Sequence, residues 1–178
     1  MPRFQDPQPL DNEHRINGFE SGVGSLDIWL VKHARAAVGA GSARTYVVID
    51  SGQERVVGYH ALSVASIEHS EATERARKGM PRNPIPAMLL ARLAVDKTVQ
   101  GRGIGAFLLR DAMSRAVSVA EQAGIRLLLV HAVDDKVRSF YEHFEFEASP
   151  SDPMNLQLLT QNAARTNRFR RPRPRVSP

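Results

Sequence analysis

Three glycines in five residues lie just past the middle of the chain, at Gly101, Gly103 and Gly105. An apolar run from Met88 to Val95 precedes them, and a helix-like apolar run follows. Because glycine leaves no side chain over the backbone, consecutive N–H groups can converge there on one anion. A helix that begins at the glycines adds unpaired N–H groups and the positive end of its dipole. The pattern predicts a cradle for a pyrophosphate, and so an enzyme that uses a nucleotide-derived cofactor.

The same residues formally fit the fingerprint G-x-G-x-x-G/A of dinucleotide-binding folds. In those folds the first glycine turns directly off the strand, whereas residues 97–100 intervene here. Counted from Ala106, the end of the fingerprint, the acidic residue expected about twenty positions further on is missing, since Glu121 comes too early and Asp134 too late. The spacing therefore argues against a dinucleotide site.

The elements that would position this loop follow from hydrophobic periodicity and turn signals. We expect helices at residues 25–38, 70–78 and 104–122, and a short helix capped by Asp134 or Asp135. We expect strands at residues 44–50, 55–67, 87–95, 125–133 and 154–159. This order predicts the α/β class, with helices flanking one mixed central sheet in a single domain over residues 1–164.

Composition narrows the function classes. The 178 residues are 42% apolar, which suits a globular domain with a sizeable core. The absence of cysteine excludes a disulfide framework, a thiolate metal site and a cysteine nucleophile. No apolar run is long enough to cross a membrane, and residues 1–7 do not read as a signal peptide. We therefore expect a soluble, cytoplasmic protein with no membrane partner.

The net charge of +5 comes from one end of the chain. Residues 165–178 hold six arginines and no acid, and without them 18 basic residues face 19 acidic ones. Three interleaved prolines favour an extended or disordered tail. Two interpretations stay open: an arm that finds a nucleic acid or an acidic partner, or a solvated tail without a specific role.

The glycine segment closely resembles the acyl-CoA motif of GCN5-related N-acetyltransferases, the GNAT superfamily. Gln-x-x-Gly-x-Gly after a strand that ends in Leu-Ala-Val-Asp is the pattern that carries the resemblance, and the order of the expected elements agrees with it. The resemblance implies acetyl-CoA as co-substrate, with its pyrophosphate on the loop and its pantetheine arm paired with the strand before it. The implied binding residues are Leu93, Ala94, Val95, Gln100, Gly101, Arg102, Gly103, Ile104, Gly105 and Ala106.

Tyr141 is the catalytic candidate that the resemblance implies. GNAT enzymes often carry a tyrosine beside the CoA sulfur in a Phe-Tyr-x-x-x-Gly-Phe pattern, and this chain has Glu145 in place of the glycine. A phenol with a pKa of about 10 is protonated at neutral pH, and it could give its proton to the departing thiolate. A core tyrosine on the apolar face from Val137 to Phe144 is the alternative.

No general base stands out. Glu68, Glu71 and Glu74 cluster in what reads as a solvated charged loop, and the six histidines show no metal-ligand spacing. His131, in an expected buried strand, is the least ordinary of them, and a core histidine is its simpler interpretation. A lysine amine has a pKa of about 10.4 and is almost fully protonated at neutral pH, so it needs a base before it can attack. An α-amine, with a pKa of about 7.7–8.0, is already partly unprotonated. The missing base therefore favours an α-amine as the acceptor.

Over residues 14–160 the chain also resembles the toxin branch of GNAT enzymes from toxin–antitoxin pairs. The segments that carry this likeness are residues 19–30, 44–49, 57–64 and 83–96. The resemblance implies acetylation of the α-amine of aminoacyl-tRNA, which blocks translation. It also implies a homodimer and a ribbon-helix-helix antitoxin that masks the active site and makes the contact with DNA.

A tRNA substrate needs basic side chains for its phosphates. The expected rim consists of Arg77, Lys78, Arg82 and Arg92. The alternative is a surface that only balances the neighbouring glutamates. Two other functions stay open for the whole chain: acetylation of protein N-termini, lysines or small amines, and a non-catalytic module that keeps the acyl-CoA fold for binding.

Overall fold

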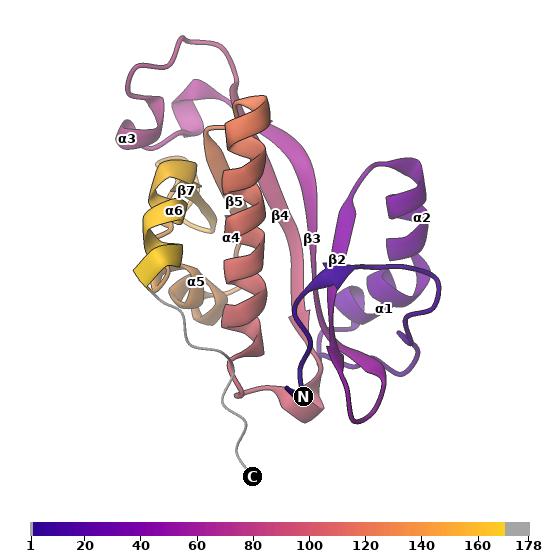
Figure 1. Ribbon diagram of the computed structural model, residues 1–178. Coiled ribbons are helices and arrows are strands. Elements are labelled where there is room, and N and C mark those ends of the chain that lie inside the picture. The colour runs from indigo at the N-terminus through magenta and orange to yellow at the C-terminus, as the bar shows by residue number, and fades with distance from the viewer. Residues whose placement is uncertain (1, 170–178) are drawn as a thin grey trace. The chain divides into compact units, whose positions relative to one another are not determined.

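The computed structural model describes residues 2–169, and the side chains of residues 2–166. Its strands are β1 (Gln8–Pro9), β2 (Arg44–Asp50), β3 (Arg55–Ile67), β4 (Ile85–Val95), β5 (Leu127–His131), β6 (Glu147–Ala148) and β7 (Asn155–Leu159). Its α-helices are α1 (Gly24–Lys32), α2 (Ala34–Ala40), α3 (Glu74–Arg77), α4 (Ile104–Ala123), α5 (Asp135–Glu142) and α6 (Thr160–Phe169). Two 3₁₀ turns are η1 (His69–Glu71) and η2 (Lys97–Val99). Figure 1 labels the α-helices and the longer strands.

The strands form one mixed sheet in the order β1-β2-β3-β4-β5-β7-β6. β4 and β5 run parallel, while β1–β2, β2–β3, β5–β7 and β6–β7 are antiparallel. The α/β class with a mixed central sheet, expected from the sequence, is confirmed. The described chain divides into two compact units that alternate along the sequence. Unit 1 comprises residues 2–63 and 92–112, and unit 2 comprises residues 64–91 and 113–169.

In unit 1, alternate residues of the strands pack on opposite faces of the sheet, as the pleat requires. Val47 joins a cluster with Leu30 of α1, whereas Val48 joins a cluster with Ile104 and Leu108 of α4. Helices therefore cover both faces of this part of the sheet. Gly58 in β3 allows the close approach of α4, because an added Cβ would lie 3.0 Å from a Leu108 methyl group.

Unit 2 has a further hydrophobic cluster around the paired parts of β4 and β5. Ala87 and Leu127 are buried there with Ala72 and Ala76, which come from the η1–α3 segment. Arg126, just before β5, holds that segment by hydrogen bonds. Its guanidinium donates to the carbonyls of Arg75, Ala76 and Lys78 at 3.1–3.4 Å. The charged segment before β4 is thus an ordered part of unit 2.

Several boundaries differ from the sequence-based expectation. The strands at 44–50 and 55–67 are confirmed, but the helix expected at 25–38 is broken at His33 into α1 and α2. The helix expected at 70–78 is the short η1–α3 pair. β1, β6 and α6 were not predicted. Because α6 extends to Phe169, the first five residues of the expected tail are helical, and the rest of that tail lies outside the described residues.

Candidate functional site

The glycine loop joins β4 to α4 within unit 1. Gly101 and Gly103 have φ values of 76° and 82°, in the left-handed region that favours glycine. A Cβ at either position would meet nothing within 4 Å, so conformation and not space requires glycine there. The amide of Phe107 donates to the carbonyl of Gly103 at 3.0 Å. The N–H groups of residues 104–106 precede this bond and have no acceptor within the helix.

The side chain of Gln100 holds the start of this loop. Its Nε2 donates to the carbonyl of Ser21 at 2.8 Å and to the carbonyl of Val95 at 2.9 Å. The sequence placed Gln100 among the cofactor-binding residues, and the structure shows its amide nitrogen engaged with the protein backbone. Its contribution in this arrangement is to fix the path of the chain into the glycines.

Asp96 is the polar centre beneath the loop and was missed by the sequence reasoning. Its carboxylate accepts hydrogen bonds from the amides of Glu20 and Thr98, from the Thr98 hydroxyl, and from Arg55 at 3.1 and 3.2 Å. Burial by itself would raise the pKa of Asp96, but these donors outweigh it and lower the pKa to about 2. A polar residue at the end of an apolar strand, followed two positions later by threonine, was the available signal.

The strand before the loop is packed on both faces. Ala94 joins the cluster with Leu30, whereas Leu93 and Val95 pack against the cluster that contains Ile104. These side chains pack in the core and hold β4 in place. The backbone groups of residues 93–95 are therefore the part of the strand that could bind a ligand.

Arg92 is engaged with aromatic rings of unit 1. Its guanidinium lies 4.4 Å from the ring centroid of Trp29, and Trp29 stacks on Tyr59 at 5.9 Å. The Tyr59 hydroxyl donates to the Leu26 carbonyl at 2.8 Å, and burial raises the pKa of this phenol above its usual range. Arg92 therefore contributes to packing in unit 1, since a cation over an indole is favourable.

The other three residues of the expected basic rim belong to unit 2. Arg77, Lys78 and Arg82 are all exposed on or just after α3. Their neighbour Arg75 pairs with Glu147 at 2.6 Å. The structure thus brings Arg77, Lys78 and Arg82 onto one segment, and places Arg92 in the other unit.

Tyr141 is buried in unit 2, with 6% of its surface exposed. Its ring lies 5.2 Å from that of Phe140 and 5.5 Å from that of Phe146. Burial raises the pKa of the phenol to about 12. The group therefore stays protonated across the neutral range and is a donor. Asp134 starts its helix, since its carboxylate accepts from the Val137 amide at 2.8 Å.

Glu145 occupies the position where the GNAT pattern has glycine. Its φ is 69°, so the backbone keeps the left-handed turn with a glutamate in it. The Thr166 hydroxyl of α6 donates to the Glu145 carboxylate. The turn that ends α5 is therefore preserved.

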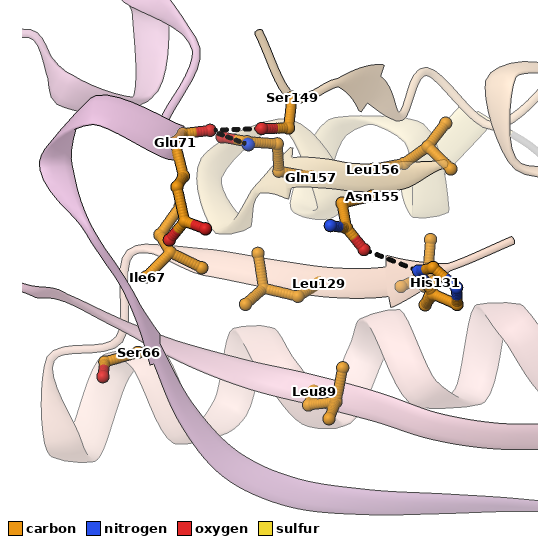
Figure 2. Close-up of a pocket in the computed structure, with 11 residues that line it drawn as sticks. Ser66, Ile67, Glu71, Leu89, Leu129, His131, Ser149, Asn155, Leu156 and Gln157 are labelled. Carbon is orange, nitrogen blue, oxygen red and sulfur yellow. Dashed lines mark hydrogen bonds between the residues drawn. The ribbon is translucent and has the colours of Figure 1, made fainter. Parts of the chain in front are cut away.

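A pocket of about 220 Å³ lies within unit 2. Figure 2 shows apolar side chains of Ile67, Leu89 and Leu129 in it, and His131 facing Asn155 at one end. At the other end the Glu71 carbonyl accepts from Ser149 Oγ at 2.7 Å and Gln157 Nε2 at 2.8 Å. The sequence missed Asn155, the first residue of β7, and Ser149, which directly follows β6.

The expectation for His131 as a core histidine is wrong. It is the last residue of β5 and its side chain is exposed. Its Nδ1 lies 2.6 Å from Asn155 Oδ1. The strand is shorter than expected, so its final side chain reaches the pocket instead of the core.

Two classes of site are absent from residues 2–169. No group of three or more His, Asp or Glu side chains could hold a metal ion there. Over the same residues, no helix is both long and apolar enough to span a bilayer.

Comparison with known proteins places these features in a family. Residues 41–148 match the family model described as an acetyltransferase (GNAT) domain. A tRNA-acetylating toxin of Mycobacterium tuberculosis is 45% identical over 163 residues, which cover 92% of this chain and 96% of the toxin.

Two solved structures are similar over most of the chain. The first, AtaT complexed with acetyl-methionyl-tRNAfMet, has a TM-score of 0.83 at 25% identity, covering 90% of this chain and 97% of AtaT. The second is a tyrosine-to-phenylalanine mutant of AtaT bound to the C-terminus of the antitoxin AtaR and acetyl-CoA. It has a TM-score of 0.77 at 25% identity, covering 91% of this chain and 96% of that chain.

Proposed function

This chain belongs to the GNAT acetyltransferase family, and we propose that it transfers the acetyl group of acetyl-CoA to the α-amine of aminoacyl-tRNA. The observation that carries the proposal is the 45% identity, over nearly the full length of both chains, to a tRNA-acetylating toxin. The complex of AtaT with acetyl-methionyl-tRNAfMet supports the same acceptor.

The glycine loop fits the pyrophosphate of acetyl-CoA. Its left-handed glycines and the free N–H groups at the start of α4 form a site for an anion. We assign the pyrophosphate to the backbone of residues 101–106 and the pantetheine arm to the β4 backbone at residues 93–95. Gln100 acts by holding the loop.

Tyr141 serves as the donor to the leaving group. In the transfer, the amine lone pair attacks the thioester carbonyl, the C–S bond breaks and the thiolate leaves. A phenol whose pKa is about 12 remains protonated until that moment. It stabilises the departing thiolate by a hydrogen bond, and the proton that it passes to the sulfur is replaced by the one that the amine nitrogen loses as the amide forms.

Arg77, Lys78 and Arg82 are the basic side chains that we assign to tRNA phosphates in unit 2. They are exposed, and no ion pair of theirs occurs within the part of the chain whose side chains are described. Exposed cations without an ion-pair partner give up little favourable interaction when they bind phosphate. Binding also releases counterions from the nucleic acid. Arg92 is assigned to the same role through the face that its stack on Trp29 leaves available.

The cellular consequence follows from the product. An acetylated α-amine cannot attack the peptidyl ester on the ribosome, so the enzyme would inhibit translation in the cytoplasm, where charged tRNA is found. We further propose a homodimer, restrained by a ribbon-helix-helix antitoxin that also supplies any contact with DNA. The antitoxin bound to AtaT supports a partner of this kind.

The proposal is tested by transfer of label from acetyl-CoA to total charged tRNA, with wild type and Tyr141→Phe side by side. We expect label on the aminoacyl group and a loss of roughly 100-fold or more in the variant, in the range of acid catalysis. Binding of acetyl-CoA should be unchanged. If label appears on peptides or small amines but not on tRNA, the acetyl acceptor is one of those amines instead of aminoacyl-tRNA. If Tyr141→Phe inhibits growth as strongly as the wild type, a non-catalytic binding module is favoured.

A further inference from the structure

Asp152, Asn155 and His131 form a chain of hydrogen bonds that ends at the pocket of unit 2. Asn155 Nδ2 lies 3.1 Å from Asp152 Oδ2. Because a carboxylate oxygen only accepts, this contact fixes which way the amide of Asn155 points. Its Oδ1 is then the atom that faces His131 Nδ1, at 2.6 Å.

This orientation determines the tautomer of the imidazole. An amide oxygen accepts but cannot donate, so Nδ1 of His131 must carry the proton that it shares with Asn155. In the neutral ring the other nitrogen, Nε2, then holds a lone pair. The histidine is thus held with an unprotonated nitrogen available, as in catalytic histidines that an amide or carboxylate orients.

The surroundings of His131 allow an acceptor to approach. Its side chain is exposed at the end of β5 and lines the pocket, whose walls include Leu89 and Leu129 (Figure 2). The pairing of β4 with β5 covers residues 87–89 of β4 and residues 127–129 of β5. His131 lies two positions beyond the last paired residue of β5, on the same face as Leu129.

We propose that His131 is the general base of the reaction, with Asn155 as its positioning residue; this rests on the proposed function. Nε2 takes a proton from the α-ammonium of the aminoacyl group, which leaves the amine lone pair free to attack the thioester carbonyl. The imidazolium that forms keeps its Nδ1–H on Asn155 and returns its new proton to water. The thiolate is provided for separately, by Tyr141.

The match of acidities supports an α-amine. Free imidazole has a pKa of about 6.5, which is within about two units of the pKa of an α-amine but about four units below that of a lysine amine. Each unit is about 1.4 kcal/mol, so an imidazole base is better matched to an α-ammonium than to a lysine ammonium. The titratable groups that line the pocket with it are confined to Glu71 of η1 among the described residues. Asp152 acts on it through Asn155.

The test is the pH dependence of acetyl transfer to charged tRNA by His131→Gln, with acetyl-CoA binding measured in parallel. At pH 6.5–7 we expect kcat to fall by roughly 10- to 100-fold. The deficit should shrink to a few-fold by about pH 9, because the α-amine is then free without help. His33→Gln, at an exposed histidine between α1 and α2, is the matched control and should leave the profile unchanged. A deficit equal at all pH values, or none, would overturn the proposal.

Asn155→Ala separates positioning from folding. It should lower kcat and leave the KM for charged tRNA within about two-fold, since the ring remains but loses its orientation. Nitrogen-15 spectra of the imidazole give a second readout that needs no substrate. We expect Nδ1–H in the wild type and a mixture of tautomers in Asn155→Ala. An Nε2–H ring in the wild type would overturn the role of His131, whereas a wild type inactive on charged tRNA would overturn the proposed function.

Discussion

The glycine loop of unit 1 and the His131 pocket of unit 2 are built in opposite ways. The loop is contiguous in sequence, and its chemistry comes from backbone N–H groups that left-handed glycines and a helix start expose. The pocket is assembled from side chains far apart in the chain; His131 and Asn155 are 24 positions apart, and Glu71 and Ser149 are 78 apart. A backbone site can be recognised from a short motif, whereas a side-chain site needs the fold.

The largest effect should come from a change in the backbone conformation of the loop. Gly103→Val forces a β-branched residue to a φ of 82°, which distorts the loop that presents the amides. We expect acetyl-CoA affinity to fall by about 100-fold, which corresponds to about 2.7 kcal/mol. Isothermal titration calorimetry with acetyl-CoA measures it directly.

The control for this substitution is Gly41→Val. Gly41 also has a positive φ, 71°, and open space around it, but it ends α2. It should lose stability to a similar extent and keep its acetyl-CoA affinity. Equal affinity losses in the two variants would mean that Gly103 matters only for folding, and the contrast between the two regions would fail.

The contrast explains what the sequence could and could not reveal. The strands at 44–50 and 55–67 and the glycine loop were predictable, because alternation and glycine spacing are local signals. The cap of α5 by Asp134 was predictable for the same reason. By contrast, nothing near Gln157 in the sequence reveals that its amide binds the Thr73 amide and the Glu71 carbonyl. Strand ends were uncertain too, and the end of β5 decides whether His131 is in the core or in a pocket.

A second prediction concerns the one buried carboxylate on which the backbone-built loop depends. Asp96 has a pKa of about 2 against an ordinary 3.8, so in that interval the unfolded chain binds more protons than the native one. The stability that Asp96 contributes is present above pH 3.8 and is lost as the pH falls toward 2. Asp96→Asn should therefore cost about 2 kcal/mol of unfolding free energy at pH 7.

Urea denaturation at pH 7 and along an acid series measures this. The variant should lose less stability than the wild type between pH 4 and pH 2, because position 96 no longer binds a proton when the chain unfolds. Asp6→Asn, at an exposed carboxylate of unit 1, provides the comparison and should follow the wild type. If both variants follow it, the side chains beneath the loop contribute little, and the loop depends on its glycines alone.

The smallest expected effect is on stability, and it concerns the one position of unit 2 at which we have described a strained backbone, Glu145. Glu145 is the non-glycine residue in the left-handed turn after α5, where a side chain costs roughly 1–2 kcal/mol. Its carboxylate accepts from Thr166, which offsets part of that cost. Glu145→Ala keeps the strained φ and loses the hydrogen bond, whereas Glu145→Gly loses the bond but relieves the strain. We therefore expect the glycine variant to be more stable than the alanine variant by about 1 kcal/mol, within the range for glycine-to-alanine exchanges at positive φ.

The midpoints of urea denaturation for the two variants and for Thr166→Val measure these differences in stability. If the two Glu145 variants are equally stable, the turn carries no strain, and the hydrogen bond from α6 is the whole contribution of this position.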